Sequence, residues 1–187
     1  MRKLILQMQI TLDGFVAGPN GEGDWVVVPG KQDPAALQAT MELIYSCDTL
    51  LLGRKNTRPF VDHWAKTADQ PESPWQPFAR YVTNMRKIVF SKTETAIAGP
   101  NLEVENGDLA TVVNELKSQP GNDIMVYGGV NFVSSLIELD LVDEYNFIVN
   151  PVAMGNGMQV FKERKILQLK SSRAFANGKV INKYVRS

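Results

Sequence analysis

Short apolar runs alternate with helix-like segments along this 187-residue chain. The runs are typical of strands, and the segments between several of them have helical periodicity; the runs cover 3–10, 49–53, 87–91, 124–128 and 144–152. Parallel strands need crossover connections of this kind, and helices on those connections cover both faces of the sheet. The pattern therefore predicts one α/β domain, residues 1–187, built on a mostly parallel sheet.

Local signals predict where the helices lie. Asp33 followed by Pro34 is a typical helix start and predicts a helix over 34–46, and Asp108 caps a second helix that continues to residue 118. A third helix is expected over 129–138, and 78–84 has room for one or two turns. Four prolines predict a loop over 56–77. At the carboxyl end, two strands around Asn177-Gly178 predict an antiparallel hairpin with a type I′ turn.

Composition excludes several kinds of function. The formal net charge is zero, which argues against a broad surface for nucleic acid or an anionic membrane. Cys47 is the single cysteine and His63 the single histidine, so there is no intrachain disulfide and the usual zinc sites are not expected. No apolar stretch is long enough to span a membrane, and we expect a cytoplasmic protein.

Three strand ends carry groups suited to anions. LLLGRKN (50–56) places Arg54 and Lys55 directly after a strand, and VFSKT (89–93) places two hydroxyls and an ammonium after another. In IMVYGG, Gly128 and Gly129 lie between a strand and a helix whose N-terminus attracts negative charge. Each motif alone also fits a plain turn or close packing. Together they suit a ligand with a pyrophosphate and a separate phosphate monoester, such as NADPH.

A fourth stretch, TLDGFVAGPNGEGDW (11–25), combines carboxylates with an aromatic ring. Asp13, Glu22 and Asp24 could each supply a proton or orient a substrate, with Trp25 beside it. The other interpretation is a pair of turns, at Asp13-Gly14 and Asn20-Gly21, with solvated carboxylates. The residues alone leave the proton donor open.

These motifs, in this order, resemble the dihydrofolate-reductase-like superfamily. The resemblance rests on TLDGFVAGPNGEGDW, LLLGRKNTRPF, KIVFSKT and VYGGVNFVSSLIELDLVDEYNFIVNPVAMGNG, and it covers nearly the whole chain. The chain is most similar to the stand-alone form of the riboflavin-biosynthesis reductase domain, the C-terminal part of a bifunctional deaminase-reductase. That family implies a three-layer α/β/α fold with a mixed sheet and bound NADPH.

The resemblance also implies roles for individual residues. In the family, positions like Gly53, Arg54, Lys55 and Asn56 lie against the cofactor phosphates, although Asn56 stands where Thr is usual. Positions like Ser91, Lys92 and Thr93 meet the adenosine 2′-phosphate, and Gly128, Gly129, Val130, Asn131 and Phe132 match the helix start that holds the pyrophosphate. Val16 and Ala17 match backbone positions near the nicotinamide carboxamide. Asp13 and Asp24 belong to the substrate-side loop, and Trp25 resembles the aromatic residue near the reacting ring.

The expected function is therefore an NADPH-dependent reductase of a small heterocyclic substrate. It resembles 5-amino-6-(5-phosphoribosylamino)uracil reductase of riboflavin biosynthesis or dihydrofolate reductase. The deaminase half is not expected, because its zinc signature needs more than the one cysteine. The alternative is a nucleotide-binding or sensory module on the same fold without catalysis. No metal, nucleic acid or membrane partner is expected, and the family suggests a homodimer.

Overall fold

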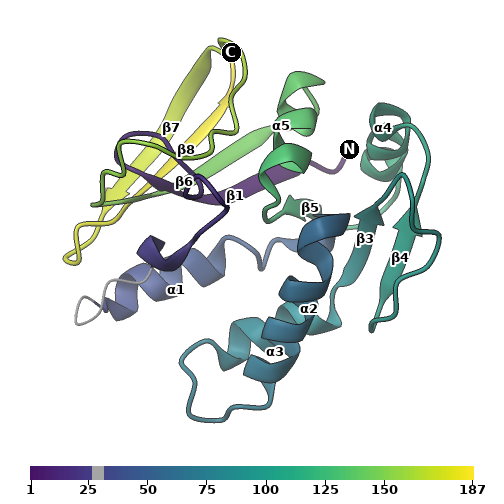
Figure 1. Cartoon of the computed structure of the whole chain (residues 1–187), viewed down its shortest axis with the longest axis horizontal. Coiled ribbons are helices and arrows are strands. Elements are labelled where there is room, and N and C mark those ends of the chain that lie inside the picture. The colour runs from purple at the N-terminus through teal and green to yellow at the C-terminus, as the bar shows by residue number, and fades with distance from the viewer. Residues whose placement is uncertain (27–31) are drawn as a thin grey trace.

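A computed structural model describes residues 1–26 and 32–187 of the chain (Figure 1). The strands are β1 (Leu4–Thr11), β2 (Cys47–Gly53), β3 (Arg86–Phe90), β4 (Leu102–Glu105), β5 (Asp123–Val126), β6 (Glu144–Asn150), β7 (Leu167–Ala174) and β8 (Val180–Arg186). The helices are α1 (Pro34–Glu42), α2 (Arg54–Ala68), α3 (Gln76–Asn84), α4 (Leu109–Ser118) and α5 (Val130–Glu138), with a 3-10 turn η1 (Asp24–Val26).

The described strands form an eight-stranded sheet in the order β4-β3-β2-β5-β1-β6-β8-β7. The first six strands in this order, β4, β3, β2, β5, β1 and β6, run parallel. β8 and β7 add an antiparallel hairpin at one edge. This arrangement confirms the predicted mixed, mostly parallel sheet with a terminal hairpin. From β1 the chain first builds the β2–β4 side, returns through β5, and then crosses to β6, so the direction of winding changes beside β1. Ligands bind at such points in open α/β sheets, outside the carboxyl ends of the strands.

Two hydrophobic cores lie on opposite faces of the sheet. Leu4, Leu6 and Met8 of β1 pack with α4 and α5 on one face. Ile5 of the same strand points to the other face, where Trp64 of α2 and Phe78 of α3 join the core. This alternation along one strand gives the three-layer α/β/α arrangement, because successive side chains of a strand point to opposite faces.

The predicted helix caps at Asp33 and Asp108 are confirmed. The Asp33 carboxylate accepts hydrogen bonds from the amides of Ala35 and Ala36, and the Asp108 carboxylate accepts from the amide of Thr111. Each carboxylate satisfies N–H groups that the first helical turn leaves free. The helix that Asp33 starts ends at Glu42, four residues earlier than predicted.

The prediction of a loop over 56–77 is wrong, because α2 covers most of this stretch. Pro59 lies inside the helix, and Pro77 lies in the first turn of α3, where its missing N–H costs little. Phe60 and Trp64, one helical turn apart, pack with α3 in the apolar core. Tertiary burial of this face outweighs the local cost of one proline.

Two further details differ from the sequence-based expectations. β4 was not predicted, since it is four residues long and only half buried at the edge of the sheet. In the terminal hairpin only Gly178 has a positive φ, at +84°, whereas a type I′ turn needs two such residues. The amide of Gly178 donates to the carbonyl of Phe175, which makes a three-residue connection that ends in a bulge at the glycine.

No helix in the described ranges is long and apolar enough to cross a membrane.

Candidate functional site

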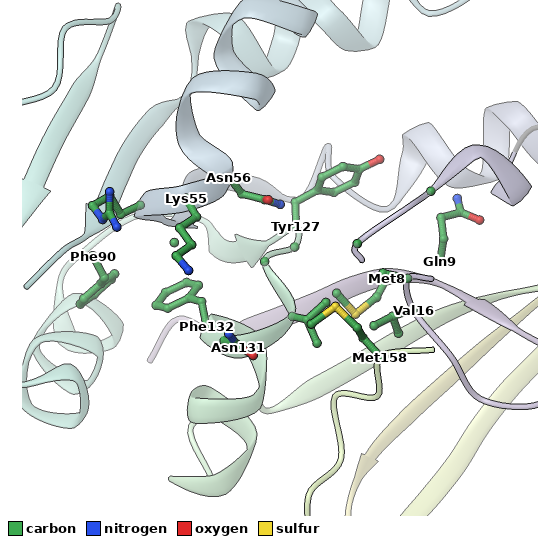
Figure 2. A pocket seen from close by; sticks show the side chains of 18 of the residues that line it. Met8, Gln9, Val16, Lys55, Asn56, Phe90, Tyr127, Asn131, Phe132 and Met158 are labelled. Carbon is green, nitrogen blue, oxygen red and sulfur yellow. The ribbon is translucent and has the colours of Figure 1, made fainter. Parts of the chain in front are cut away.

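A cleft of about 930 Å³ opens at the carboxyl ends of the parallel strands (Figure 2). It runs along the ends of β2, β3 and β5 and reaches over β1 to β6. Its lining includes every residue that the sequence analysis assigned to cofactor binding: Val16, Ala17, Gly53, Arg54, Lys55, Asn56, Ser91, Lys92, Thr93, Gly128, Gly129, Val130, Asn131 and Phe132. The fold thus brings four separate motifs together at one surface.

The diglycine corner is shaped by backbone conformation. Gly128 and Gly129 have φ values of +137° and +83°, which side chains with a Cβ rarely adopt. A Cβ on Gly129 would meet no atom closer than 3.7 Å, so packing does not demand a glycine there. The corner turns the chain from β5 into α5 and leaves the start of that helix open to the cleft.

The N-terminus of α5 has no side-chain cap. Its first main-chain helical bond runs from the amide of Val133 to the carbonyl of Gly129, so the amides of Val130, Asn131 and Phe132 precede the helical ladder. All three of these residues line the cleft. Free N–H groups and the positive end of the helix dipole make this a place for an anion.

The N-terminus of α2 repeats this arrangement beside it. Gly53 ends β2 and precedes the helix, and no side chain caps that turn either. Here the glycine is a packing requirement, because a Cβ would lie 2.8 Å from the Cβ of Phe132. Gly53 therefore allows the first turns of α2 and α5 to approach each other. These two helix starts open into the cleft, whereas α1 and α4 carry aspartate caps and α3, also without a side-chain cap, does not line the cleft.

Cationic side chains flank these helix starts. Arg54 and Lys55, the first two residues of α2, are exposed and line the cleft. Figure 2 shows Lys55 directed toward Phe132. The Arg54 guanidinium lies 4.0 Å from the Glu94 carboxylate, and both are more than 40% exposed, so this ion pair is weak and solvent-screened.

The segment after β3 forms a tight turn. The Ser91 hydroxyl oxygen accepts hydrogen bonds from the amides of Thr93 and Glu94, while Lys92 and Thr93 are exposed at the cleft. The Ser91 hydroxyl proton is still available as a donor. Beside the turn, Phe90 stacks on Phe132 with ring centroids 5.3 Å apart, which gives this end of the cleft an aromatic surface.

The opposite end of the cleft is formed by β1 and the loop that follows it. Gln7, Met8 and Gln9 of β1 line it, together with residues 16–17 and 20–23, Ile148 and Met158. Ala17 forms a backbone bridge with Met158, so a segment far along the chain holds this loop in place. Met8, Val16 and Met158 gather at the apolar wall in Figure 2, and Gln9 points into the same end.

The three residues assigned to catalysis are absent from the cleft lining. The Asp13 carboxylate accepts hydrogen bonds from the Thr11 hydroxyl and from the amides of Met154 and Gly155. The Thr11 hydroxyl, followed by the Gly155 amide, lowers the pKa of Asp13, which makes it a weak proton donor at neutral pH. This aspartate joins the 11–17 loop to the 154–158 segment.

Asp24 and Trp25 belong to η1, and the Trp25 indole donates to the carbonyl of Glu22. Glu22 does line the cleft, but its two carboxylate oxygens accept from the backbone amide and the side-chain amide of Asn20. The Asn20 side chain is the main reason that the pKa of Glu22 is lowered. Asp13 and Glu22 therefore organise turns of this loop, whereas the second interpretation of the sequence expected turns with solvated carboxylates.

Several lining residues were not assigned from the sequence: Gln7, Met8, Gln9, Phe90, Ile148 and Met158. The two glutamines interrupt an otherwise apolar central strand, and that interruption is a signal that could have identified them. Met158 carries no such signal, because its position depends on the backbone bridge to Ala17. Tyr127, directly before the diglycine corner, is half-buried and lines the cleft.

His63 and Cys47, the single histidine and the single cysteine, do not line the cleft. His63 is exposed on α2 and stacks edge-on against Trp64. Cys47 is fully buried, and burial raises the pKa of its thiol to about 12, so it is a small core residue rather than a nucleophile. Among the described residues no group of three or more His, Cys, Asp or Glu side chains could hold a metal ion.

Comparisons with known proteins agree with this geometry. The chain is 34% identical over 184 residues to "Uncharacterized protein YyaP" of Bacillus subtilis (strain 168), covering 96% of this chain and 92% of that one. It is 26% identical to "Uncharacterized protein YwjB" of the same organism, over 100% of this chain and 99% of the relative.

Solved structures share the fold. A "Putative riboflavin biosynthesis protein" from Shewanella sp. PV-4 superposes with a TM-score of 0.72 at 21% identity, over 99% of both chains. A diaminohydroxyphosphoribosylaminopyrimidine deaminase/5-amino-6-(5-phosphoribosylamino)uracil reductase from Thermotoga maritima has a TM-score of 0.69 at 17% identity; the match covers 100% of this chain and 57% of that one.

The family model described as "RibD C-terminal domain" matches residues 2–181, almost the full length of the chain. The match includes β1 to β7, the helix starts of α2 and α5, and the turn after β3. The protein therefore belongs to the RibD C-terminal domain family.

Proposed function

We propose that this protein is an NADPH-dependent reductase of a small heterocyclic substrate. One observation carries the proposal: two helix N-termini without side-chain caps and a Ser-Lys-Thr turn line a single cleft. NADPH carries a pyrophosphate and a separate 2′-phosphate, which match anion sites of this number and kind. The reductase named in the Thermotoga maritima relative, and membership of the same family, support reduction as the reaction.

The residues present fit this cofactor. The free amides of Val130, Asn131 and Phe132, with Arg54 and Lys55, would hold the pyrophosphate. Lys92, with the Ser91 and Thr93 hydroxyls, would hold the 2′-phosphate, because an ammonium and hydroxyl donors suit a phosphate monoester. The stacked rings of Phe90 and Phe132 offer a flat apolar surface for a purine. Val16 and Ala17 would place the nicotinamide at the β1 end.

When bound, NADPH supplies the hydride. The protein positions the two reactants, since holding them in a reactive geometry removes much of the entropic barrier. The loop over the β1 end is held by Asp13 through its bonds to the 154–158 segment, and it covers that end of the cleft. With Asp13 and Glu22 engaged in turns, a water molecule at this end is the proton source that the geometry favours.

Thermal denaturation with NADPH and NADH in parallel tests the proposal. A ligand at about one hundred times its Kd stabilises a protein by about 2.7 kcal/mol, which raises the melting temperature measurably. We expect NADPH to stabilise the protein more than NADH does. Neither cofactor changing the melting temperature would contradict the proposal. Binding without NADPH oxidation by any pteridine or pyrimidine substrate would favour a nucleotide-binding module without catalysis.

The 2′-phosphate assignment has its own test in Lys92→Glu. This change places a negative charge where the phosphate would lie, so it should weaken NADPH at least tenfold and leave NADH nearly unchanged. Lys170→Glu, on the exposed edge strand β7, is the matched control and should affect neither cofactor. If Lys92→Glu loses affinity for NADPH and for NADH equally, the 2′-phosphate lies elsewhere. Titration of each variant by fluorescence or calorimetry gives the four dissociation constants.

A further inference from the structure

The β1 end of the cleft has a floor of side-chain amides. Gln7 and Gln9 alternate with apolar residues on the central strand, and both line the cleft. Residues two apart on a strand lie on the same face, about 7 Å from each other. Gln7 is 1% exposed and Gln9 half-buried, which is unusual for uncharged polar side chains without full hydrogen bonding.

The orientation of Gln7 is set by α1. Its side-chain N–H donates to the carbonyl of Thr40, 3.1 Å away, so Nε2 faces the helix. Its Oε1 is buried and has no partner among the described residues. A buried amide oxygen without a donor loses its hydration without compensation, so this group favours a ligand that donates a hydrogen bond to it.

The orientation of Gln9 follows from Asn150. The Asn150 side-chain nitrogen donates to Gln9 Oε1 at 2.8 Å and also lies near the carbonyls of Ile10 and Ile148. The two backbone carbonyls beside it identify this Asn150 atom as nitrogen, and the Gln9 atom that faces it is therefore the oxygen. Gln9 Nε2, with two N–H groups, remains for the cleft.

Tyr127 adds a hydroxyl from the opposite wall. Figure 2 shows its ring directed toward the end of the cleft that holds Gln9 and away from Lys55. Burial raises the pKa of Tyr127 to about 12, so the phenol stays protonated and can donate a hydrogen bond throughout the physiological range. The β1 end thus offers one acceptor, Gln7 Oε1, and donors on Gln9 and Tyr127.

The charges of the residues that line the β1 end of the cleft limit which substrates it can bind. The cations of the cleft, Arg54, Lys55 and Lys92, belong to the strand ends where we place the cofactor phosphates. Among the described residues that line the β1 end, none is cationic, and the one carboxylate, Glu22, is held by Asn20. A substrate phosphate placed there would lose hydration without gaining an opposite charge.

From these groups we infer that the substrate is an uncharged heterocycle with a lactam edge and without a phosphate group. A lactam presents an N–H and a C=O side by side, which complements the acceptor on Gln7 and the donors on Gln9 and Tyr127. This inference rests on the proposed function. It distinguishes this protein from the Thermotoga maritima relative, whose name specifies a phosphoribosyl substrate.

Uridine and uridine 5′-monophosphate are a matched pair of probes, since they share a lactam-containing ring and differ by one phosphate. Each is titrated by calorimetry into the protein saturated with NADP⁺. We expect uridine to bind and the monophosphate to bind several-fold more weakly. Monophosphate binding tenfold tighter than uridine would overturn the inference, and so would no binding of uridine.

Two variants test the amides. Gln7→Leu should weaken uridine about tenfold, and Gln9→Met should do the same at a position where partial exposure makes folding easier to retain. Asn150 keeps the carbonyls of Ile10 and Ile148 as acceptors in Gln9→Met. Unchanged uridine affinity in a folded variant would contradict the inference.

The cofactor measurement separates the two proposals. 2′-Phospho-ADP-ribose carries the phosphates of NADPH but no nicotinamide, so the rise in melting temperature that it causes should be the same in Gln7→Leu, Gln9→Met and the wild type, because these amides do not face the proposed phosphate sites. If NADPH gives no rise but uridine binds in a Gln9-dependent manner, the reductase proposal fails and the lactam site remains. If NADPH binds and uridine does not, the lactam inference alone fails.

Discussion

Single glycines around the cleft differ in the physical reason for their presence. Gly53 lies where a Cβ would contact Phe132, so it permits close packing of two helices. Gly129 has a φ of +83°, and a Cβ there would meet its nearest atom only at 3.7 Å, so this glycine permits a backbone turn rather than close packing. The same residue type thus serves packing at one helix start and ligand access at the other.

Gly129→Ala should therefore reduce both stability and cofactor affinity. The strained φ costs about 1–2 kcal/mol of folding free energy, and the added methyl group occupies the space for a phosphate. Gly178→Ala is the control for φ strain outside the cleft, because φ there is +84°; its methyl group would also lie 3.1 Å from Pro151, so its loss of stability should be at least as large. Urea unfolding should show losses in both variants, and NADPH titration a loss only in Gly129→Ala. Equal NADPH affinity in the two variants would show that no phosphate approaches Gly129.

Asp13→Asn tests whether the carboxylate of Asp13 acts in catalysis or in structure. The amides of Met154 and Gly155 share one oxygen of Asp13, so the oxygen of Asp13→Asn can still accept from both, but the Thr11 hydroxyl loses its acceptor and the negative charge is lost; the 11–17 loop and the 154–158 segment should therefore loosen. We expect a lower melting temperature and weaker NADPH binding. An unchanged melting temperature and NADPH affinity with turnover abolished would instead make Asp13 a catalytic residue.

The lowered pKa of Asp13 predicts how the stability of the protein changes with pH. The pKa of Asp13 is lowered in the folded state, chiefly by the Thr11 hydroxyl. Its stabilising contribution is therefore complete above the unfolded value of about 3.9 and is lost as pH falls through the lower folded pKa. Acid unfolding followed by circular dichroism should be steeper for the wild type than for Asp13→Asn.

At the scale of elements, the helix starts differ in how their first amides are satisfied. α1 and α4, which lie away from the proposed phosphate sites, have aspartate caps that satisfy some of their first amides. α2, α3 and α5 lack a side-chain cap, and of these three α2 and α5 line the cleft. An uncapped helix start loses about 1 kcal/mol relative to a capped one, and a bound anion can recover that loss.

Asn131→Asp separates stability from binding at α5. A carboxylate in the first turn of a helix stabilises it by about 0.3–1 kcal/mol, but here it would repel the cofactor phosphates. We expect a higher melting temperature without ligand and at least tenfold weaker NADPH binding. Ala35→Glu, exposed at the same position of α1, should stabilise without affecting NADPH. A parallel change in stability and affinity in Asn131→Asp would exclude a phosphate at this helix start.

At the scale of the whole molecule, Cys47 reports on the integrity of the core. It is fully buried beside Ile5 and Leu50 at the start of β2, and burial raises the pKa of its thiol to about 12. Above pH of about 8.5 an unfolded chain loses this proton while the folded chain keeps it. The free energy of unfolding should therefore fall as pH rises from about 8.5.

Cys47→Ala removes this contribution. Urea unfolding at pH 7.5 and 9.5 should show a larger loss of stability with pH for the wild type than for the variant, although the variant is less stable at both values. The native thiol should also react with a disulfide reagent only as fast as the core opens. Rapid reaction at neutral pH would contradict the burial of this residue.

Much of the architecture could be predicted from the sequence, because its determinants are local. Apolar runs set the parallel strands, Asp33 and Asp108 set two helix starts, and the motifs at three strand ends had to meet at one edge of a parallel sheet. The α2 helix could not be predicted, because Pro59 opposes it locally and only burial of Phe60 and Trp64 against α3 stabilises it. β4 is too short to give a periodic signal.

For the candidate site, the sequence by itself determined which residues have groups suited to phosphate. Arg54, Lys92 and Gly129 each follow a strand, so their chemistry and their place at the end of the strand can both be read from the sequence. Only the tertiary structure decided what the other residues do. It removed Asp13 from the cleft by bonding it to a segment some 140 residues away, and it placed Met158 and the amides of Gln7 and Gln9 in that cleft. The physical reason is that a strand end is a local feature, whereas a substrate compartment forms only where β1, α1 and distant loops pack together.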